Sequence, residues 1–373
     1  MRRNLIIFVF IAIISLIFGS IIFYFVGLNN KEDIKLSGKI NVVVDSNNYE
    51  AVSEAVVSFK KLHSRVEINL IKEADVYKKI SDEIKEARVK EDVTVISEQY
   101  TRSLIKTDDS PFLDVTQDIS NMKESFSKGK LDTLTENKKI YGIPWTSEPI
   151  LIIYRSDIFS VEGINVDDIK TWQDFREVGK NLTANTGKKF LIYSSSQGDK
   201  LNNTLLSQLR ISYEDKENSK RVTDEISGMV SEGNLYSTNS ITALAKKEEA
   251  LAIIINPCDA VNIMSEVTSL KGKWGAMKLP AFEPGGNRDV SLGGYNLLIN
   301  KNTKNINLSK EFSKFLSTDS NTAFMNLTKY GKFSAAYTLY QREKFNNTSE
   351  YFNTNLWSQF AYIEKNSPNN VYN

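Results

Sequence analysis

Apolar and polar residues along this chain alternate with two periods, one typical of strands and one typical of helices. The first part is predicted to contain a strand at Lys39–Asp45, a helix at Tyr49–Leu62, a strand at residues 66–70, a helix at residues 76–84 and a strand at Asp92–Ile96. This order predicts a parallel sheet with right-handed crossovers. Ligands bind such sheets beyond the carboxyl ends of the strands. The tips Asp45-Ser46-Asn47-Asn48 and Ser97-Glu98-Gln99-Tyr100 are therefore candidate ligand contacts, with polar turns and helix caps as the alternative interpretation.

An unbroken apolar run at Ile150–Tyr154 predicts a strand buried on both faces. It follows the turn Tyr141-Gly-Ile-Pro-Trp145, so Trp145 lies where the chain enters a sheet. A ring in this place could line a cleft and stack on the C–H face of a sugar. It could equally be a core residue, since tryptophan is usually largely buried.

A second unit is predicted beyond Tyr154. Its elements are a helix that begins with a capping box at Thr171–Asp174, strands at Lys189–Tyr193, Ala250–Asn256 and Val290–Asn300, and helices at Ile241–Lys247, Ser309–Leu316 and Asn321–Lys329. Gly293 and Gly294 interrupt the last strand and permit another backbone to approach closely.

The composition excludes several classes of function. The chain has 373 residues, enough for two domains, and a net charge of +1, which argues against a nucleic-acid-binding protein. It has one cysteine, Cys258, and one histidine, His63. These exclude an internal disulfide and make a zinc cluster or a Ser-His or Cys-His triad a poor interpretation. We expect no metal and no cofactor.

The N-terminus predicts a membrane anchor. Arg2 and Arg3 precede residues 5–28, which contain no charged residue, and about 20 apolar residues suffice to span a bilayer. No small-residue cleavage pattern follows, and no cysteine is present here for lipid attachment. We expect residues 1–4 inside the cell, 5–28 as a transmembrane anchor, 29–38 as a linker and the remainder outside.

Five separated segments together resemble family 1 extracellular solute-binding proteins, the receptors of ABC sugar importers. In chain order they are Lys139–Phe159, Thr171–Leu182, Glu248–Ala260, Gly272–Thr318, and Lys329–Tyr340 with Asn366–Asn370. The resemblance covers residues 38 to 370, and its strength lies in the shared order of the segments.

The resemblance implies an α/β fold of the two-lobed periplasmic-binding-protein type (type II), similar to maltose-binding protein. Lobe 1 would comprise residues 39–148 and 290–336, and lobe 2 residues 149–289 and 337–373. The connections between them would fall near Trp145–Pro149 and Gly293–Asn296, with another beyond Ser334. The ligand-contact positions carried over from the family are Asp45, Ser46, Glu98, Trp145, Asn256, Asp259, Gly294 and Tyr295. Trp145 and Tyr295 would stack on sugar rings, while Glu98 and Asp259 would accept hydroxyl hydrogen bonds.

The chain departs from the family at three points. Cys258 replaces a usual tryptophan, so stacking would rest more heavily on Trp145. The lipid-bearing cysteine of the family is absent. Relatives usually continue beyond the Ser367-Pro-Asn-Asn stretch into a last helix, which leaves the completion of lobe 2 open.

The resemblance implies a monomeric, non-enzymatic receptor that binds an oligosaccharide and partners the permease subunits of an ABC importer. Two alternatives stay open. One is a membrane-anchored sensor that signals ligand occupancy to a kinase. The other is an extracellular glycosidase, which would need two facing carboxylates such as Glu98 and Asp259 about 5–9.5 Å apart.

Overall fold

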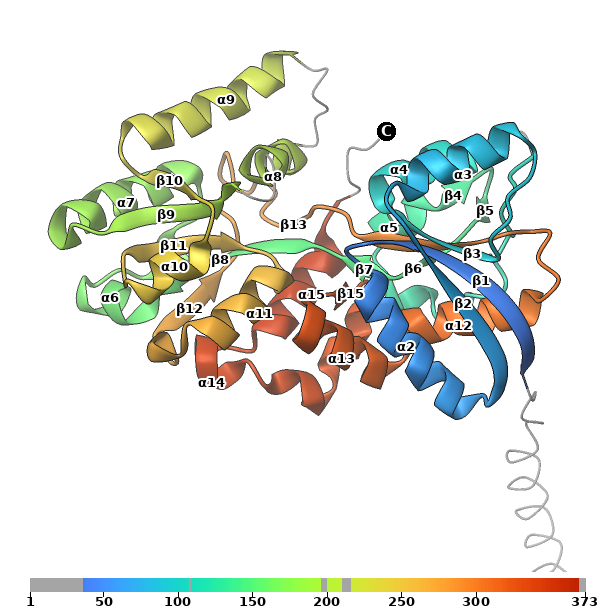
Figure 1. The fold of residues 1–373 in the computed structure, drawn as a ribbon. Coiled ribbons are helices and arrows are strands. Elements are labelled where there is room, and N and C mark those ends of the chain that lie inside the picture. Colours follow the sequence, from blue (N-terminus) through green and yellow to red (C-terminus); the bar gives the residue numbers. More distant parts are fainter. Residues whose placement is uncertain (1–35, 107–108, 196–199, 210–215, 369–373) are drawn as a thin grey trace, which may run out of the picture.

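The computed structural model describes residues 36–106, 109–195, 200–209 and 216–368, which form two lobes joined by several crossings of the chain (Figure 1). Each lobe is built on one mixed sheet. The predicted anchor at residues 5–28 lies outside the described residues. Within the described part of the chain, no helix has the length and apolar character needed to cross a bilayer.

The first lobe contains a five-stranded sheet in the order β2-β1-β3-β14-β6. Its strands are β1 (Ser37–Asp45), β2 (Arg65–Glu73), β3 (Val93–Ser97), β14 (Tyr295–Ile299) and β6 (Ile143–Pro144). The predicted parallel β-α-β-α-β unit is confirmed, because β1 pairs in parallel with both β2 and β3. Strand β14 returns from much later in the chain and runs antiparallel to β3 and β6.

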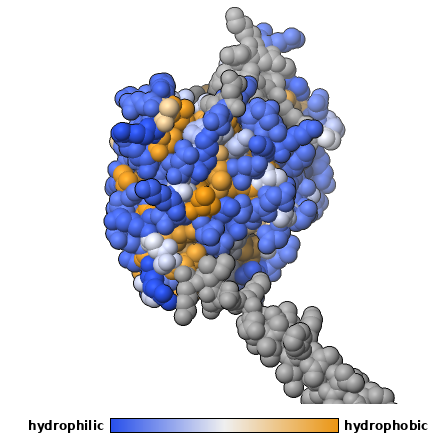
Figure 2. Space-filling view, turned by 90° about the vertical axis from the view of Figure 1, so that its right-hand side faces the viewer, coloured by the Kyte–Doolittle hydropathy of each residue, from blue (hydrophilic) through white to orange (hydrophobic). Residues whose placement is uncertain are grey.

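The helices predicted at 49–62, 76–84, 309–316 and 321–329 are confirmed in the first lobe, and two further helices of this lobe, at 98–105 and 128–133, were not predicted. The helices of this lobe are α2 (Tyr49–Leu62), α3 (Val76–Lys85), α4 (Glu98–Ile105), α5 (Lys128–Thr133), α12 (Ile306–Thr318) and α13 (Ser320–Tyr330). The predicted apolar face of α2 is buried from Val52 to Phe59. On the side of this lobe that faces away from the second lobe, hydrophilic residues cover most of the surface (Figure 2).

The second lobe contains a sheet in the order β10-β9-β11-β8-β12, with β13 paired to β8. Its strands are β8 (Pro149–Arg155), β9 (Lys189–Ser194), β10 (Leu235–Thr238), β11 (Ala250–Ile255), β12 (Trp274–Met277) and β13 (Val290–Ser291). Its helices are α6 (Ser156–Val161), α7 (Trp172–Thr186), α8 (Lys200–Leu209), α9 (Lys216–Ser231), α10 (Ile241–Lys246) and α11 (Pro257–Glu266). The predicted capping box at Thr171–Asp174 begins α7.

Strand β8 is buried on both faces, as its unbroken apolar run predicts. Ile150 and Ile152 belong to a hydrophobic cluster on one side of the second sheet, and Leu151 and Ile153 to a second cluster on the other side. The second cluster continues without a break into the core of the first lobe. The two lobes therefore share a core in addition to their connections.

The C-terminal helices contribute to this shared core. Helix α15 (Leu356–Asn366) lies near the middle of the molecule, while α14 (Ser349–Phe352) lies at the bottom of the second lobe and packs against β12 (Figure 1). Helix α15 buries Trp357 and Phe360 and packs against β8 and β13. It completes this side of the second sheet, which the sequence analysis had left open.

The predicted single strand at Val290–Asn300 is wrong in one respect. The chain forms two strands, β13 and β14, which belong to different sheets. Gly293 and Gly294 separate them with φ angles of +113° and +132°, a region that residues with side chains rarely adopt. The two glycines thus end one strand and let the chain pass to the other lobe.

Candidate functional site

The ends of strands from both sheets face the junction between the lobes. In the first sheet, Tyr295 is paired with Ser97, so β14 begins at the edge where β1 and β3 end. In the second sheet, Ile255 is paired with Leu151, so β11 ends where β8 begins. Because β8 follows directly from the crossing at residues 146–148, both edges meet the same crossing. We define these ends and the crossings between them as the junction.

Three crossing segments run side by side at the junction. The backbone N–H of Trp145 donates to the Tyr295 carbonyl at 2.9 Å, and that of Glu148 donates to the Gly293 carbonyl at 3.1 Å. The third segment, β15 (Phe333–Ser334), pairs antiparallel with β7 (Thr146–Ser147). The family resemblance implied the first two segments, and the structure brings them together; the third was expected beyond Ser334 and lies at Phe333–Ser334.

Gly294 is held in close contact with the first crossing. A Cβ atom at this position would lie 2.0 Å from the Thr146 carbonyl oxygen and 2.8 Å from the Ser147 Cα. These neighbours are backbone atoms, which cannot move aside as a flexible side chain would. The predicted close approach at Gly294 is therefore confirmed, and its role is to allow the crossings to pack.

On the side of the first lobe, the predicted residues Asp45 and Tyr295 lie together with Asn48. The Asp45 carboxylate accepts a hydrogen bond at 3.0 Å from the backbone N–H of Asn48 and another at 3.0 Å from its side chain. Burial raises the pKa of Tyr295 above its ordinary value, and the negative charge of Asp45 raises it further. Tyr295 thus keeps its proton and offers a neutral hydroxyl. Ser46 is exposed in the turn that follows β1.

On the side of the second lobe, Asn256 and Asp259 form a capping box at the start of α11. The Asn256 side chain accepts from the backbone N–H of Asp259, and Asp259 accepts from that of Asn256. Asp259 also pairs with Lys200 of α8 at 2.5 Å, and both side chains are buried. These two residues were expected as ligand contacts, and the structure uses their side chains to cap α11.

Glu98 is likewise engaged inside the protein. Its carboxylate pairs with Lys130 of α5, and both side chains are buried. The Lys130 ammonium group also donates to the Gly293 carbonyl, which ties α5 to a crossing. Because Glu98 and Asp259 are each paired with a buried lysine, the structure gives no support to their use as the free acid and base of a glycosidase.

Trp145 requires a correction to the expectation that it stacks on a ligand. Its side chain is 2% exposed and belongs to the hydrophobic cluster that both lobes share. Its indole contacts the Tyr295 ring edge to face, with centroids 6.4 Å apart. Neither face of the indole is open to solvent, so the indole supports the Tyr295 ring from the side of the core. Of the two predicted rings, Tyr295 is the more accessible.

The structure adds two charged residues that the sequence analysis did not select, Glu148 and Lys332. Burial raises the pKa of Glu148, and the nearby charges of Lys200 and Lys332 oppose this shift. Burial lowers the pKa of Lys332, and the negative charge of Glu148 is the largest of the effects that oppose this shift. Glu148 lies inside the predicted crossing Trp145–Pro149, so its position in the sequence was the available signal. Lys332 directly precedes β15.

Cys258 lies beside these charges. A Cβ atom at Gly331 would lie 2.5 Å from the Cys258 Cα, which places the start of α11 against the third crossing. Burial raises the pKa of the Cys258 thiol, which favours its protonated form. Across the described residues, no group of three or more His, Cys, Asp or Glu side chains is arranged to hold a metal ion.

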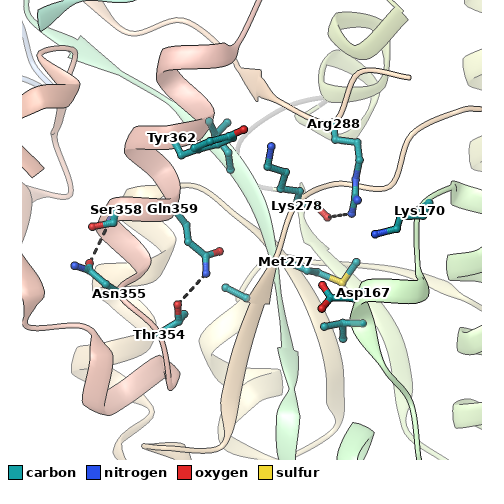
Figure 3. Close-up of a pocket in the computed structure, with 13 residues that line it drawn as sticks. Asp167, Lys170, Met277, Lys278, Arg288, Thr354, Asn355, Ser358, Gln359 and Tyr362 are labelled. Atoms are coloured by element: carbon teal, nitrogen blue, oxygen red, sulfur yellow. Dashed lines mark hydrogen bonds between the residues drawn. The ribbon is translucent and has the colours of Figure 1, made fainter. Parts of the chain in front are cut away.

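A cavity of about 610 Å³ lies away from the junction, between α15 and β12 on the second lobe. In Figure 3, Gln359 and Tyr362 project from α15 on one side, with Lys278 and Arg288 opposite them. These cations are engaged: Lys278 pairs with Asp289 at 2.8 Å, and the Arg288 Nε donates to the Leu279 carbonyl at 2.6 Å. None of the eight predicted ligand contacts lines this cavity.

Comparison with known proteins finds a family over most of the chain. The sequence pattern of the family described as bacterial extracellular solute-binding protein matches residues 45–323. An arabinooligosaccharide-binding protein of Bacillus subtilis (strain 168) is 25% identical over 229 residues, which cover 57% of this chain and 52% of that protein. A lactose-binding protein of Rhizobium radiobacter is 24% identical over 157 residues, covering 40% of this chain and 37% of that protein. The chain thus matches about half or less of the length of these relatives.

Solved structures show the same fold at low sequence identity. The sugar-binding protein MalE from Xanthomonas citri has a TM-score of 0.72 and 15% identity, over 87% of this chain and 85% of that chain. Maltose-bound MalE3 of T. maritima has a TM-score of 0.67 and 18% identity, over 89% and 88% of the two chains. These similarities establish the two-lobed periplasmic-binding-protein fold.

Proposed function

Because the chain belongs to the family of bacterial extracellular solute-binding proteins, as the match over residues 45–323 shows, we propose that it binds a carbohydrate at the junction of its lobes. Its role would be to deliver this ligand to the permease subunits of an ABC importer. The observation that carries the proposal is the convergence of both sheet edges on one set of crossings, with Asp45, Tyr295, Glu148 and Lys332 gathered there. Concave sites between lobes are where small ligands usually bind.

The side chains at the junction suit a ligand with many hydroxyl groups. Asp45 and Glu148 can accept hydroxyl hydrogen bonds, Lys332 can donate them, and hydrogen bonds to charged groups are the stronger ones. Tyr295 supplies a ring and a neutral hydroxyl. We retain Ser46, Asn256 and the Gly294 backbone as ligand contacts. We assign Glu98, Asp259 and Trp145 the role of holding these contacts in place.

An oligosaccharide is the ligand class that the relatives favour. The curated relatives are named for binding arabinooligosaccharides and lactose, and one structural neighbour holds maltose. Closing would occur by rotation about the three crossings, since hinges are a few residues at element ends. The lobes would divide at these crossings, as in the type II variant of the fold, with residues 39–148 and 290–336 in lobe 1 and 149–289 and 337–373 in lobe 2.

We further propose that the receptor acts as a monomer outside the cell, held to the membrane by residues 5–28. The family is extracellular, and this segment is long enough to cross a bilayer. A linker at residues 29–38 would connect the anchor to the first lobe.

Thermal unfolding with arabinooligosaccharides, maltose and lactose tests the ligand class. A true ligand at one hundred times its dissociation constant stabilises the folded state by about 2.7 kcal/mol. Titration calorimetry of Tyr295→Phe then tests the site. This variant removes one hydroxyl and keeps the ring, and we expect affinity about tenfold weaker with little change in stability. Equal affinity in the variant would remove Tyr295 from the site, and the absence of any saccharide effect would refute the ligand class.

A further inference from the structure

One end of the first lobe gathers exposed basic residues. Strands β1 and β2 begin together there, since Ser37 is paired with Arg65. Helix α2 ends at the same place, and its last residues continue through His63 and Ser64 into Arg65. The loop before α12 joins them, because the Asn305 side chain donates to the Lys39 carbonyl at 2.8 Å. In Figure 1 the starts of β1 and β2 and the end of α2 lie at the bottom of the right-hand lobe.

We name this surface the basic edge and define it by Lys39, Lys60, Lys61, Arg65 and Lys304, all of which are exposed, together with Leu62. Within the basic edge, Lys39 forms an ion pair with Glu67 at 2.6 Å. Among the described residues, the other four cations have no acidic partner within 4.0 Å. Since the whole chain carries a net charge of +1, this excess is balanced by negative charge elsewhere on the molecule.

An exposed apolar residue lies among these cations. Leu62, the last residue of α2, is 67% exposed, while Phe59 one turn earlier is buried in the core. Leu62 directly follows Lys60 and Lys61, and it also borders Phe315 and Asp319 in a surface hollow. An exposed apolar side chain next to lysines is a combination that inserts at the boundary between headgroups and acyl chains.

The position of the chain entry places this edge close to a bilayer. Residues 29–36 separate the apolar segment 5–28 from β1, and eight extended residues span at most about 28 Å. Residues 29–36 contain two acidic and two basic side chains, so they do not neutralise the edge. Strand β1 has nine residues and runs about 30 Å from the basic edge to Asp45 at the junction.

We propose that the basic edge rests on anionic phospholipid headgroups and that Leu62 inserts among them. The proposal rests on the anchor proposed above and is independent of the ligand. Contact of this kind fixes the orientation of the receptor, with the junction held about 30 Å from the bilayer by the length of β1. Each basic residue near an anionic surface contributes about a fivefold increase in surface association.

The test uses the full chain in nanodiscs of phosphatidylcholine, with or without phosphatidylglycerol. In a Cys258→Ser background, Leu62→Cys carries a fluorophore, and quenching by nitroxide-labelled lipids is measured. The matched control is Val161→Cys in the second lobe, where the side chain is 85% exposed. We expect quenching at position 62 to be at least twice that at position 161 in anionic discs, and to fall to the control level in high salt.

Substitution of Lys60, Lys61 and Arg65 by glutamine should abolish the quenching at position 62, because the three exposed charges supply the attraction. Equal quenching at positions 62 and 161 in anionic discs would overturn the proposal, as would quenching at position 62 that does not depend on lipid charge. Failure of the full chain to float with lipid vesicles would refute the anchor and, with it, the proposal. Saccharide affinity, measured separately, would be unaffected by that result.

Discussion

The buried Lys130–Glu98 pair provides a sharp test of how the first lobe is tied to the crossings. Both side chains are at most 3% exposed, and the Lys130 ammonium group also donates to the Gly293 carbonyl. Lys130→Met keeps the length of the side chain and removes the charge. Glu98 would then be a buried carboxylate without its cation, a change that typically costs about 3–5 kcal/mol. We expect a loss of this size in the free energy of unfolding, measured by urea denaturation.

A second variant separates the charge effect from packing. In Lys130→Met with Glu98→Gln, no charge of the pair remains, so the double variant should be more stable than Lys130→Met alone. The exposed pair Lys271–Glu350, with N–O distance 2.7 Å and side chains 57% and 82% exposed, is the matched control. Lys271→Met should change stability by at most about 1 kcal/mol. The reasoning is refuted if Lys130→Met costs no more than this control, or if the two substitutions of the buried pair are simply additive.

Three further predictions concern the junction and a buried carboxylate of α15. Gly294→Ala should lower the free energy of unfolding, measured with denaturant, by at least about 3 kcal/mol, because backbone strain is added to a clash with Thr146. The control is Gly163→Ala, where φ is +69° and no atom lies within 4 Å of the added Cβ; it should lower the free energy of unfolding by only about 1 kcal/mol. Trp145→Ala should lose about 3–5 kcal/mol of stability, and a stability-neutral loss of affinity would contradict its core role. Burial raises the pKa of Glu364 above its ordinary 4.5, so its contribution to stability is largest below that pH and is lost as pH rises through the raised pKa. Glu364→Gln, which keeps an acceptor for the Ser127 hydroxyl, should therefore stabilise the protein at pH 7 and not at pH 4; a variant less stable at both pH values would contradict this.

The sequence predicted the fold well where burial and periodicity agree. The apolar face of α2 is buried by packing on one side of a sheet. The continuous apolar run of β8 is buried by covering both faces of the strand. Helix α15 was missed although Trp357, Phe360 and Ile363 recur at helical spacing, so its pattern was available. The division of residues 290–300 between two sheets was not predictable from β-propensity, because it depends on the φ angles of Gly293 and Gly294.

The candidate site was predicted in outline. Asp45, Gly294 and Tyr295 lie at the junction because strand ends and glycines fix them there. The pairing of Glu98 with Lys130 and of Asp259 with Lys200 could not be foreseen, since the partners are 32 and 59 residues apart and no local pattern links them. For the same reason, the burial of Trp145 became visible only with the packing of both lobes around it.

The most direct test of the central claim is a crystal structure of the protein with the oligosaccharide that stabilises it most. The account predicts a sugar between the two sheets, within hydrogen-bonding distance of Asp45 and in contact with Tyr295. Saccharide density in the outer cavity beside Tyr362, with the junction unoccupied at saturating ligand, would contradict it.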